Sequence, residues 1–157
     1  MSGIDVQIDD PFVSEINEPE VARAVAWALA LEGHSTDDVS VVFTDDETVS
    51  DLNLRYRQID GPTDVLSFSA IEPAPGFVVA PDAAPYLGDI VIAVPYSRRQ
   101  AAALGRSLDD ELRLLVVHGV LHLLGYDHAS PEEEAHMWAR QDEILAGLAQ
   151  GGPGVAA

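Results

Sequence analysis

The sequence predicts an α+β fold of mixed α/β character, in which a small mixed sheet of about four strands packs with about five helices. Three observations support this prediction. Apolar and polar side chains alternate in residues 4–8, which is typical of a strand with one wet face. Patterns of helical period that begin at Pro19 and Pro131 indicate amphipathic helices. The continuous apolar run at residues 88–94 indicates a central strand that is covered on both faces.

The first half of the chain alternates strand and helix patterns. After the strand at residues 4–8, a helix is expected to begin near Pro19 and to end by Gly33. Its apolar positions follow the helical period: Val21, Ala24, Val25, Ala28 and Leu29. Residues 39–43 predict a second strand. Asp45 can cap the helix that follows, whose inward positions would be Val49, Leu52 and Tyr56.

The middle of the chain predicts two further strands and a long connection between them. The turn-prone segment Asp60–Pro62 precedes a short strand at residues 64–68. Residues 71–86 carry four prolines and predict a loop that is long for a compact domain. This loop is interpreted either as a mobile flap or binding element or as a tolerated surface insertion. Residues 88–94 predict the fourth strand.

The remainder of the chain predicts three helices. Residues 96–104 form the first, and residues 109–124 form a second that is apolar nearly all round and therefore central to the domain. Ser130 opens a capping box with proline at the first helical position. The amphipathic helix that it starts is expected to run through Trp138, Leu145 and Leu148.

Length and composition predict one ordinary domain. The chain has 157 residues, of which 47% are hydrophobic, so residues 1–150 can bury a core without disulfides and residues 151–157 are expected to form a flexible tail. No targeting segment is visible at the acidic start, and the apolar run at residues 24–31 is too short to span a bilayer. We therefore expect a cytoplasmic protein without a membrane partner. The absence of cysteine is compatible with a reducing compartment.

The charge balance is strongly acidic. The chain has 27 acidic and 8 basic residues, all arginines, for a formal net charge of −19. This balance argues against broad, nonspecific adhesion to nucleic acid or anionic membranes. Because salt confines surface fields to about 8–10 Å, RNA can still bind where arginines gather. Arg98, Arg99 and Arg106 are candidates to extend a phosphate path, and the alternative is that they are ordinary solvated residues.

Three of the five histidines, His118, His122 and His128, lie at spacings that suit one metal ion. On a helix, His118 and His122 would project from one face with Cβ atoms about 5–6 Å apart. Gly125 can end that helix in a left-handed conformation, which lets the chain return His128 beside the pair. Three imidazoles around an open position are typical of catalytic zinc sites, whereas structural sites usually add a fourth ligand, often cysteine.

The surroundings of these histidines favour a metal over a chance pair of helical residues. In an apolar helix, His118 and His122 are expected to be buried polar groups that need a partner. The spacing resembles that of the metzincin proteases, but Gly119 stands where those enzymes carry a glutamate general base. A hydrolase of peptides or small molecules is therefore the less favoured alternative, because the proton carrier is missing.

Four stretches of the chain, in this order, resemble the YbeY family of metal-dependent hydrolases: Leu52-Asn53 through Tyr56-Arg57, Pro62-Thr63-Asp64-Val65-Leu66-Ser67-Phe68, Leu87-Gly88-Asp89-Ile90, and His118 to His128. The resemblance covers the chain from Asp45 onward, and the last motif is highly specific. It implies that His118, His122 and His128 bind one Zn²⁺ per chain. It also implies that Arg57 is a functionally important arginine near the metal.

The resemblance further implies an endoribonuclease that is specific for single-stranded RNA. Its expected roles are rRNA processing, including maturation of the 16S rRNA 3′ end, and ribosome quality control. The expected partners are rRNA, the small ribosomal subunit and its assembly proteins, with no DNA. The alternative is a metal-stabilised ribosome-assembly binding factor with little or no nuclease activity.

The residues suggest how such a site would cleave a phosphodiester. A zinc ion lowers the pKa of a bound water to about 7, which makes hydroxide available at neutral pH. Either this hydroxide attacks phosphorus, or the metal activates the neighbouring 2′-hydroxyl; both routes stay open. Arg57 is the candidate phosphate clamp, unless it pairs with a nearby carboxylate. Asp127 is expected either to orient a ligand imidazole or to cap the loop.

Overall fold

The structure is a computed structural model that describes residues 3–70, 86–126 and 129–150. Its strands form one mixed sheet: β1 (Ile4–Ile8), β2 (Asp38–Thr44), β3 (Val65–Ser69) and β4 (Tyr86–Ala93). Its helices are a single 3₁₀ turn, η1 (Asp10–Phe12), and five α-helices: α1 (Glu18–Leu31), α2 (Asp46–Arg57), α3 (Val94–Leu104), α4 (Leu108–Leu123) and α5 (Pro131–Ala149). The predicted α+β fold is confirmed, element by element. Most of the predicted 71–86 loop and all of the 151–157 tail lie outside the described residues.

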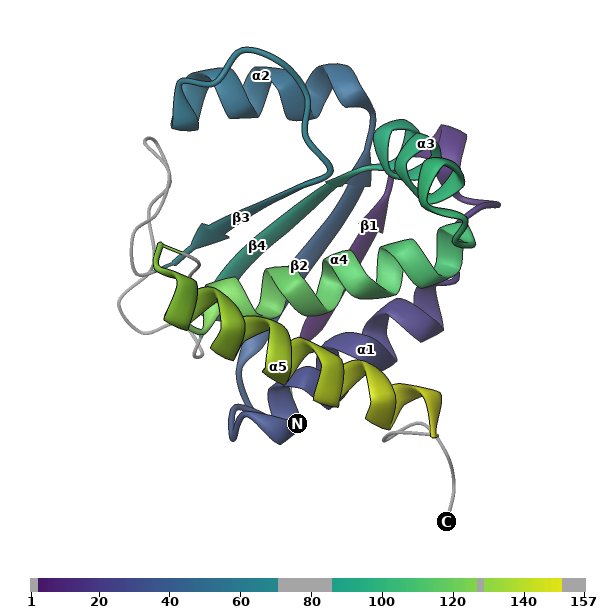
Figure 1. Cartoon of the computed structure of the whole chain (residues 1–157). Coiled ribbons are helices and arrows are strands. Elements are labelled where there is room, and N and C mark those ends of the chain that lie inside the picture. The colour runs from purple at the N-terminus through teal and green to yellow at the C-terminus, as the bar shows by residue number, and fades with distance from the viewer. Residues whose placement is uncertain (1–2, 71–85, 127–128, 151–157) are drawn as a thin grey trace.

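The sheet has the strand order β1-β2-β4-β3 (Figure 1). β1, β2 and β4 are parallel, and β3 pairs antiparallel with β4 at the edge. Because side chains alternate along a strand, Ile90 and Ile92 face one side of the sheet while Val91 and Ala93 face the other. All four are buried, so the prediction that residues 88–94 form a strand covered on both faces is confirmed.

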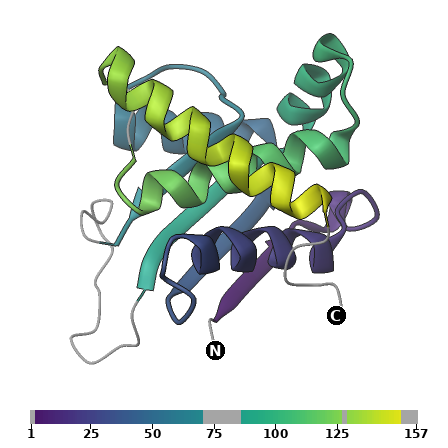
Figure 2. The ribbon, with the colours of Figure 1, turned by 60° about the horizontal axis from the view of Figure 1, so that its bottom comes forward.

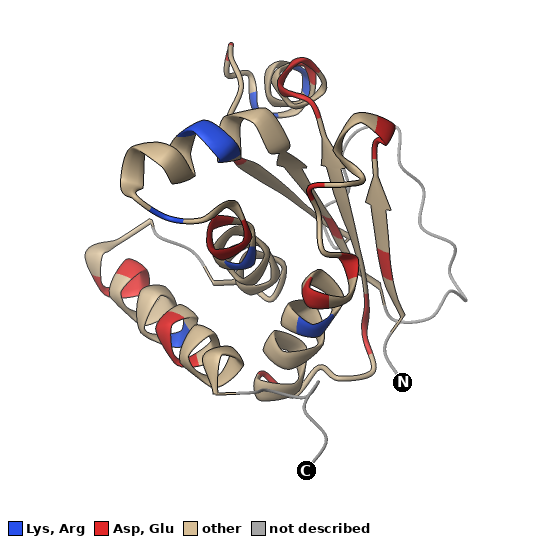
Figure 3. Cartoon of the chain, turned by 90° about the vertical axis from the view of Figure 1, so that its right-hand side faces the viewer, with Lys and Arg blue, Asp and Glu red and all other residues tan. Residues whose placement is uncertain are grey.

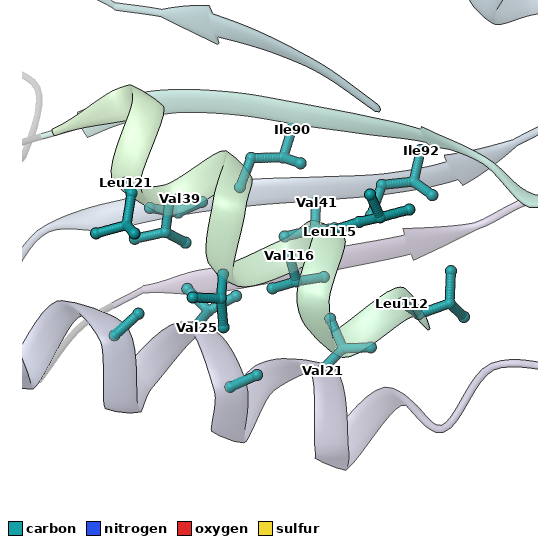
Figure 4. Close-up of a cluster of buried hydrophobic side chains, with 14 of the residues drawn as sticks. Val21, Val25, Val39, Val41, Ile90, Ile92, Leu112, Leu115, Val116 and Leu121 are labelled. Atoms are coloured by element: carbon teal, nitrogen blue, oxygen red, sulfur yellow. The ribbon is translucent and has the colours of Figure 1, made fainter. Parts of the chain in front are cut away.

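Two apolar clusters hold the helices to the two faces. The larger lies between the sheet and helices α1 and α4, where Val21, Val25, Val41, Ile90 and Val116 meet (Figure 4). The smaller lies under α2, where its members are Val49, Leu66, Val91 and Ala93. α5 packs on α4 and α1 as an outer layer (Figure 2). α4 is therefore the central helix, as its apolar composition predicted.

None of the helices in the described ranges has the length and apolar character that a membrane span requires.

Side chains with an oxygen acceptor cap four of the α-helices. The Asp45 carboxylate accepts from the Thr48 amide at 2.7 Å, and the Ser130 hydroxyl accepts from the Glu133 amide at 3.1 Å. These are the two predicted caps, and both are confirmed. Asn17 and Ser107 cap α1 and α4 in the same way.

The buried face of α5 differs in part from the predicted one. Its fully or nearly fully buried residues are Met137, Ile144 and Leu148, whereas Trp138 is 54% exposed. The predicted helix does run through Trp138, Leu145 and Leu148, but Trp138 lies outside the buried stripe, because that stripe runs through the residue before it. A Cβ atom on Gly147 would lie 2.6 Å from Nε1 of Trp27, and that indole donates to the Ile144 carbonyl at 3.2 Å. Trp27 thus docks α5 on α1.

A polar cluster around Glu32 joins α1, α5 and the end of α4. The carboxylate, whose side chain is 10% exposed, accepts from the Tyr126 hydroxyl at 2.5 Å and from Nε of Arg140 at 2.9 Å. Burial by itself raises the pKa of Glu32, but the hydrogen bonds from Tyr126 and Arg140 outweigh it. The pKa of Glu32 therefore lies below its ordinary value of 4.5.

Replacing Glu32 tests this cluster. Glu32→Gln is expected to lower the free energy of unfolding at neutral pH by about 2 kcal/mol, because hydrogen bonds to a charged acceptor are lost. A depressed folded-state pKa stabilises the fold above the unfolded-state pKa, and this contribution is lost as the pH falls through the folded-state value. The difference between wild type and variant should therefore shrink as the pH falls below 4.5. Urea unfolding at a series of pH values measures it.

The exposed acid Glu132, also on α5, provides the control. Glu132→Gln should change stability by a few tenths of a kcal/mol, as expected for a surface charge in the first turn of a helix. A Glu32→Gln difference that stayed constant across the acid range would contradict the assignment of this pKa.

Candidate metal centre

Two of the three predicted metal ligands lie side by side on α4. The ring centroids of His118 and His122 are 4.7 Å apart, and the ring planes meet at 74°. Both residues are half-buried, whereas the apolar sequence of the helix predicted buried histidines. The difference arises because Val116, Gly119 and Leu123 take the face of α4 that meets the sheet, so the histidines lie at the margin of the core. A donor pair that reaches solvent suits a site that a metal and a substrate must enter.

The predicted turn after α4 is confirmed. Gly125 has φ +101°, and its amide donates to the His122 carbonyl at 3.0 Å. The next amide, of Tyr126, donates to the Leu121 carbonyl at 3.0 Å. This pair of bonds is the Schellman motif, which reverses the chain at a helix end. His128 and Asp127 lie outside the described residues, so their part in the centre stays a prediction.

Tyr126 fixes the chain where it leaves this turn. Its hydroxyl binds Glu32, and its ring stacks on His136 with centroids 5.3 Å apart and planes at 23°. Burial, followed by the hydrogen bond to Glu32, raises the pKa of Tyr126, so the phenol keeps its proton to donate. The residue that precedes positions 127 and 128 is thus held between α1 and α5.

His118 has a partner on α5. Its Nδ1 lies 3.0 Å from Oε1 of Gln141. Metal-binding histidines commonly use one ring nitrogen for the metal and the other for such a partner. The imidazole nitrogens of His118 and His122 therefore fit a zinc ion, whose preferred donors include nitrogen. Within residues 3–70, 86–126 and 129–150, no group of three or more His, Cys, Asp or Glu side chains could hold a metal.

Arg57 lies in the last turn of α2 and contacts β3. Its NH2 group donates to the Ser67 carbonyl at 2.6 Å, and its guanidinium carbon lies 5.8 Å from the centroid of the Phe68 ring. These contacts hold the head of an otherwise exposed side chain. A guanidinium has five N–H donors, so further donors can meet a ligand.

The arginines differ in whether acidic residues neutralise them. Six of the eight form ion pairs with carboxylates: Arg23, Arg98, Arg99, Arg106, Arg113 and Arg140. Figure 3 shows acidic and basic positions interspersed over the helices. In the part of the chain that the structure describes, Arg55 and Arg57 take part in none of these ion pairs. The candidate phosphate path through Arg98, Arg99 and Arg106 is therefore weakened, because each of those charges is already paired with an acid.

A groove of about 670 Å³ lies between α4 and α5, and neither His118 nor His122 is among its lining residues. Trp138 and Gln141 line it, and its charged residues are two arginines and two aspartates: Arg106, Arg113, Asp110 and Asp142. Because these charges cancel, the groove offers little attraction for a phosphate. The end of α2, by contrast, carries Arg55 and Arg57, which take part in none of the described ion pairs.

Several polar residues of the sequence motifs have structural partners. The Asn53 side chain, 4% exposed, donates to the Gly61 carbonyl at 2.9 Å and so holds the turn before β3. Asp64 accepts from Gln100, which also donates to the fully buried Glu111. Asp89 accepts from the Tyr86 hydroxyl. These residues position strands and helices around the centre.

Sequence reasoning missed Gln141 and Glu32. The signal for Gln141 was available: it is a polar residue at a core-facing spacing between Met137 and Ile144. For Glu32 there was no local signal, because its partners Tyr126 and Arg140 are 94 and 108 residues away. His136, predicted to be an ordinary surface residue, is exposed, and His34, predicted to be the same, is half-buried with its ring paired to Asp37.

Comparisons with known proteins identify the family. The family model described as endoribonuclease YbeY matches residues 7–149. The chain is 44% identical over 147 residues to the endoribonuclease YbeY of Roseiflexus sp. (strain RS-1), with 92% of each chain covered. It is 46% identical over 144 residues to that of Geobacillus kaustophilus, covering 86% of this chain and 92% of the relative. A Thermotoga maritima protein known from its solution structure shares the fold, with a TM-score of 0.56, 22% identity and coverage of 99% and 100% of the two chains. The chain belongs to the endoribonuclease YbeY family.

Proposed function

We propose that this protein is a zinc-dependent endoribonuclease that cuts single-stranded RNA during rRNA processing, including maturation of the 16S rRNA 3′ end, and that it serves ribosome quality control. The observation that supports this most is the adjacent pair His118 and His122 on the central helix of a chain that the endoribonuclease YbeY family model matches over residues 7–149. The family supports the RNA cleavage, and the histidine pair supports the metal.

The residues that would hold one zinc ion per chain are His118, His122 and His128. When bound, zinc supplies Lewis acidity and a source of hydroxide at neutral pH. α4 sets the spacing of the first two imidazoles, and the turn at Gly125 ends that helix three residues before His128 in the sequence. Tyr126, the residue after Gly125, is held through its hydrogen bond to Glu32.

Arg57 is proposed to bind the phosphate at the cleaved bond. Its charge is not cancelled by a carboxylate among the described ion pairs, in contrast to six other arginines. The Ser67 carbonyl and the Phe68 ring hold its head group in place, so little conformational freedom is lost on binding. A planar guanidinium can donate two parallel bonds to phosphate oxygens.

The proposed partners are single-stranded rRNA, the small ribosomal subunit and its assembly proteins, in the cytoplasm. A net charge of −19 opposes binding to RNA over a broad surface. Contact with RNA is therefore proposed to be confined to the metal centre and the end of α2. Assembly proteins that bind RNA need basic surfaces. Such surfaces would complement the acidic remainder of this protein's surface.

A second candidate function is a metal-stabilised assembly factor with little or no nuclease activity. The observation that favours it is the neutralisation of most arginines by acids, which leaves few groups to bind a long RNA. The two candidates differ in whether the metal-binding residues are needed for cleavage or only for the fold.

Removal of the metal separates these two functions. Purified protein is expected to contain about one zinc per chain and to cut a single-stranded RNA, and a chelator should abolish the cleavage. His122→Ala should lose zinc and cleavage together, because one of the adjacent donors is gone. Metal content by mass spectrometry and cleavage of an end-labelled RNA measure these outcomes.

The matched control is His34→Ala, which removes a half-buried histidine ring that is paired with Asp37. It should keep wild-type zinc content and activity. If wild-type protein binds zinc but cuts no RNA at any salt concentration, the assembly-factor function is preferred.

Replacement of Arg57 tests the phosphate clamp. Arg57→Ala is expected to lower kcat/KM for RNA by about 10²–10³-fold, the usual effect of removing one stabilising donor. Arg57→Lys should recover only part of this loss, because an ammonium keeps the charge but not the paired donors. Zinc content should stay at the wild-type level in both.

The matched control is Arg98→Ala, because the Arg98 guanidinium is already paired with Glu15. It should cut RNA at the wild-type rate. A loss of activity equal to that of Arg57→Ala would indicate a general effect of positive charge and would remove the special role of Arg57.

Replacement of Gly119 tests the less favoured function, that of a peptidase. A Cβ atom at this position would lie 2.9 Å from Cγ2 of the fully buried Ile90. Gly119→Glu, which installs the carboxylate of the protease motif, is therefore expected to lower the free energy of unfolding by more than about 3 kcal/mol and to give no casein cleavage. Ala103→Glu, at an exposed position of α3, should be near neutral. Casein cleavage by a folded Gly119→Glu variant would contradict the expectation that α4 has no room for a glutamate at this position.

A further inference from the structure

We propose that Gln141 is a positioning residue for the metal centre. Its amide oxygen accepts a hydrogen bond from Nδ1–H of His118 and leaves Nε2 of that ring as the lone-pair donor toward the metal. This inference rests on the proposed function, since a bound zinc is what Nε2 would serve. It assigns to α5 a role in the centre in addition to covering α4.

The geometry supports this assignment. Nδ1 of His118 and Oε1 of Gln141 are 3.0 Å apart, within the range of an N–H···O hydrogen bond. A neutral imidazole has one N–H group and one lone pair, so a proton held on Nδ1 places the lone pair on Nε2. The bond thus selects the tautomer as well as the orientation of the ring.

The position of Gln141 in its helix is a second, independent observation. Residues 137, 141, 144 and 148 follow the spacing of one helix face, and Met137, Ile144 and Leu148 are 2% exposed or less. Gln141 interrupts this apolar stripe. Its side chain is half-buried and lines the groove between α4 and α5, and its amide oxygen lies within hydrogen-bond distance of His118.

The helix that carries Gln141 is held in place. One turn after Gln141, the Ile144 carbonyl accepts a hydrogen bond from the Trp27 indole of α1. The indole ring lies in the space left by Gly147. The residue before Gln141 is Arg140, whose Nε donates to the Glu32 carboxylate. The amide of Gln141 is therefore presented to His118 from a fixed backbone, which is the requirement for orienting a ligand.

Two replacements of Gln141 separate its hydrogen bond from its size. Gln141→Leu keeps a side chain of similar volume but removes the acceptor. Gln141→Glu keeps an acceptor oxygen at the same distance along the side chain. Gln150→Leu, at the exposed end of the same helix, is the matched control. Zinc affinity is measured by competition with a chromophoric chelator, and folding by urea unfolding.

The expected result is a zinc affinity about 10- to 100-fold weaker for Gln141→Leu, the usual effect of losing a ligand's hydrogen-bond partner. Gln141→Glu and Gln150→Leu should bind zinc close to the wild-type level. Wild-type affinity in a folded Gln141→Leu protein would overturn the role of Gln141. If wild-type protein binds no zinc at all, the proposed function fails instead.

A second measurement needs neither zinc nor a variant. In metal-free wild-type protein at about pH 8.5, well above the ordinary histidine pKa of about 6.5, long-range ¹H–¹⁵N spectra report which ring nitrogen carries the proton. We expect His118 to carry it on Nδ1. A proton on Nε2 would mean that the amide is turned to donate to Nδ1, and would overturn the proposal even if Gln141→Leu does not fold.

Discussion

The placement of the two candidate metal ligands on α4 depends on how closely that helix lies on β4. At Gly119 the helix backbone comes so near Ile90 that an added Cβ atom would lie 2.9 Å from the isoleucine side chain. Ile90 is fully buried in a strand paired on both sides, so it cannot yield easily. This contact fixes the rotation of α4, because a turned helix would bring a larger residue against the strand. The direction in which His118 and His122 project is therefore set by the core of the protein.

The parts of the fold that local chemistry determines were predictable. Asp45 and Ser130 were recognisable as caps because each supplies an oxygen to an amide three residues later. The turn at Gly125 was recognisable because a helix that must reverse needs a residue tolerant of positive φ. The pairing of His118 with His122 followed from helical spacing alone. Each of these depends on residues within one or two turns of each other.

What sequence reasoning could not determine depends on contacts between distant segments. The half-burial of His118 follows from which face of α4 meets the sheet, a choice made by the contact of Gly119 with Ile90 and not by the local sequence pattern. The exposure of Trp138 likewise follows from packing, since its neighbour Met137 takes the inner position. The neutralisation of Arg98 by Glu15 joins residues 83 positions apart. Charge alone could not reveal which arginines are available, because an ion pair is a property of the folded chain.

α5 contacts both α4 and the turn that follows it through consecutive residues. Arg140 binds Glu32, which holds Tyr126 at the exit from the turn, while Gln141 binds His118 on α4. A shift of α5 along its axis would therefore disturb both the helix that carries two imidazoles and the turn that leads to the third. Trp27 resists such a shift, because its indole is bonded to α5 and lies in the gap at Gly147. The outermost helix of the domain thus connects the position of the candidate ligand His118 to the packing of α1, which carries no candidate ligand.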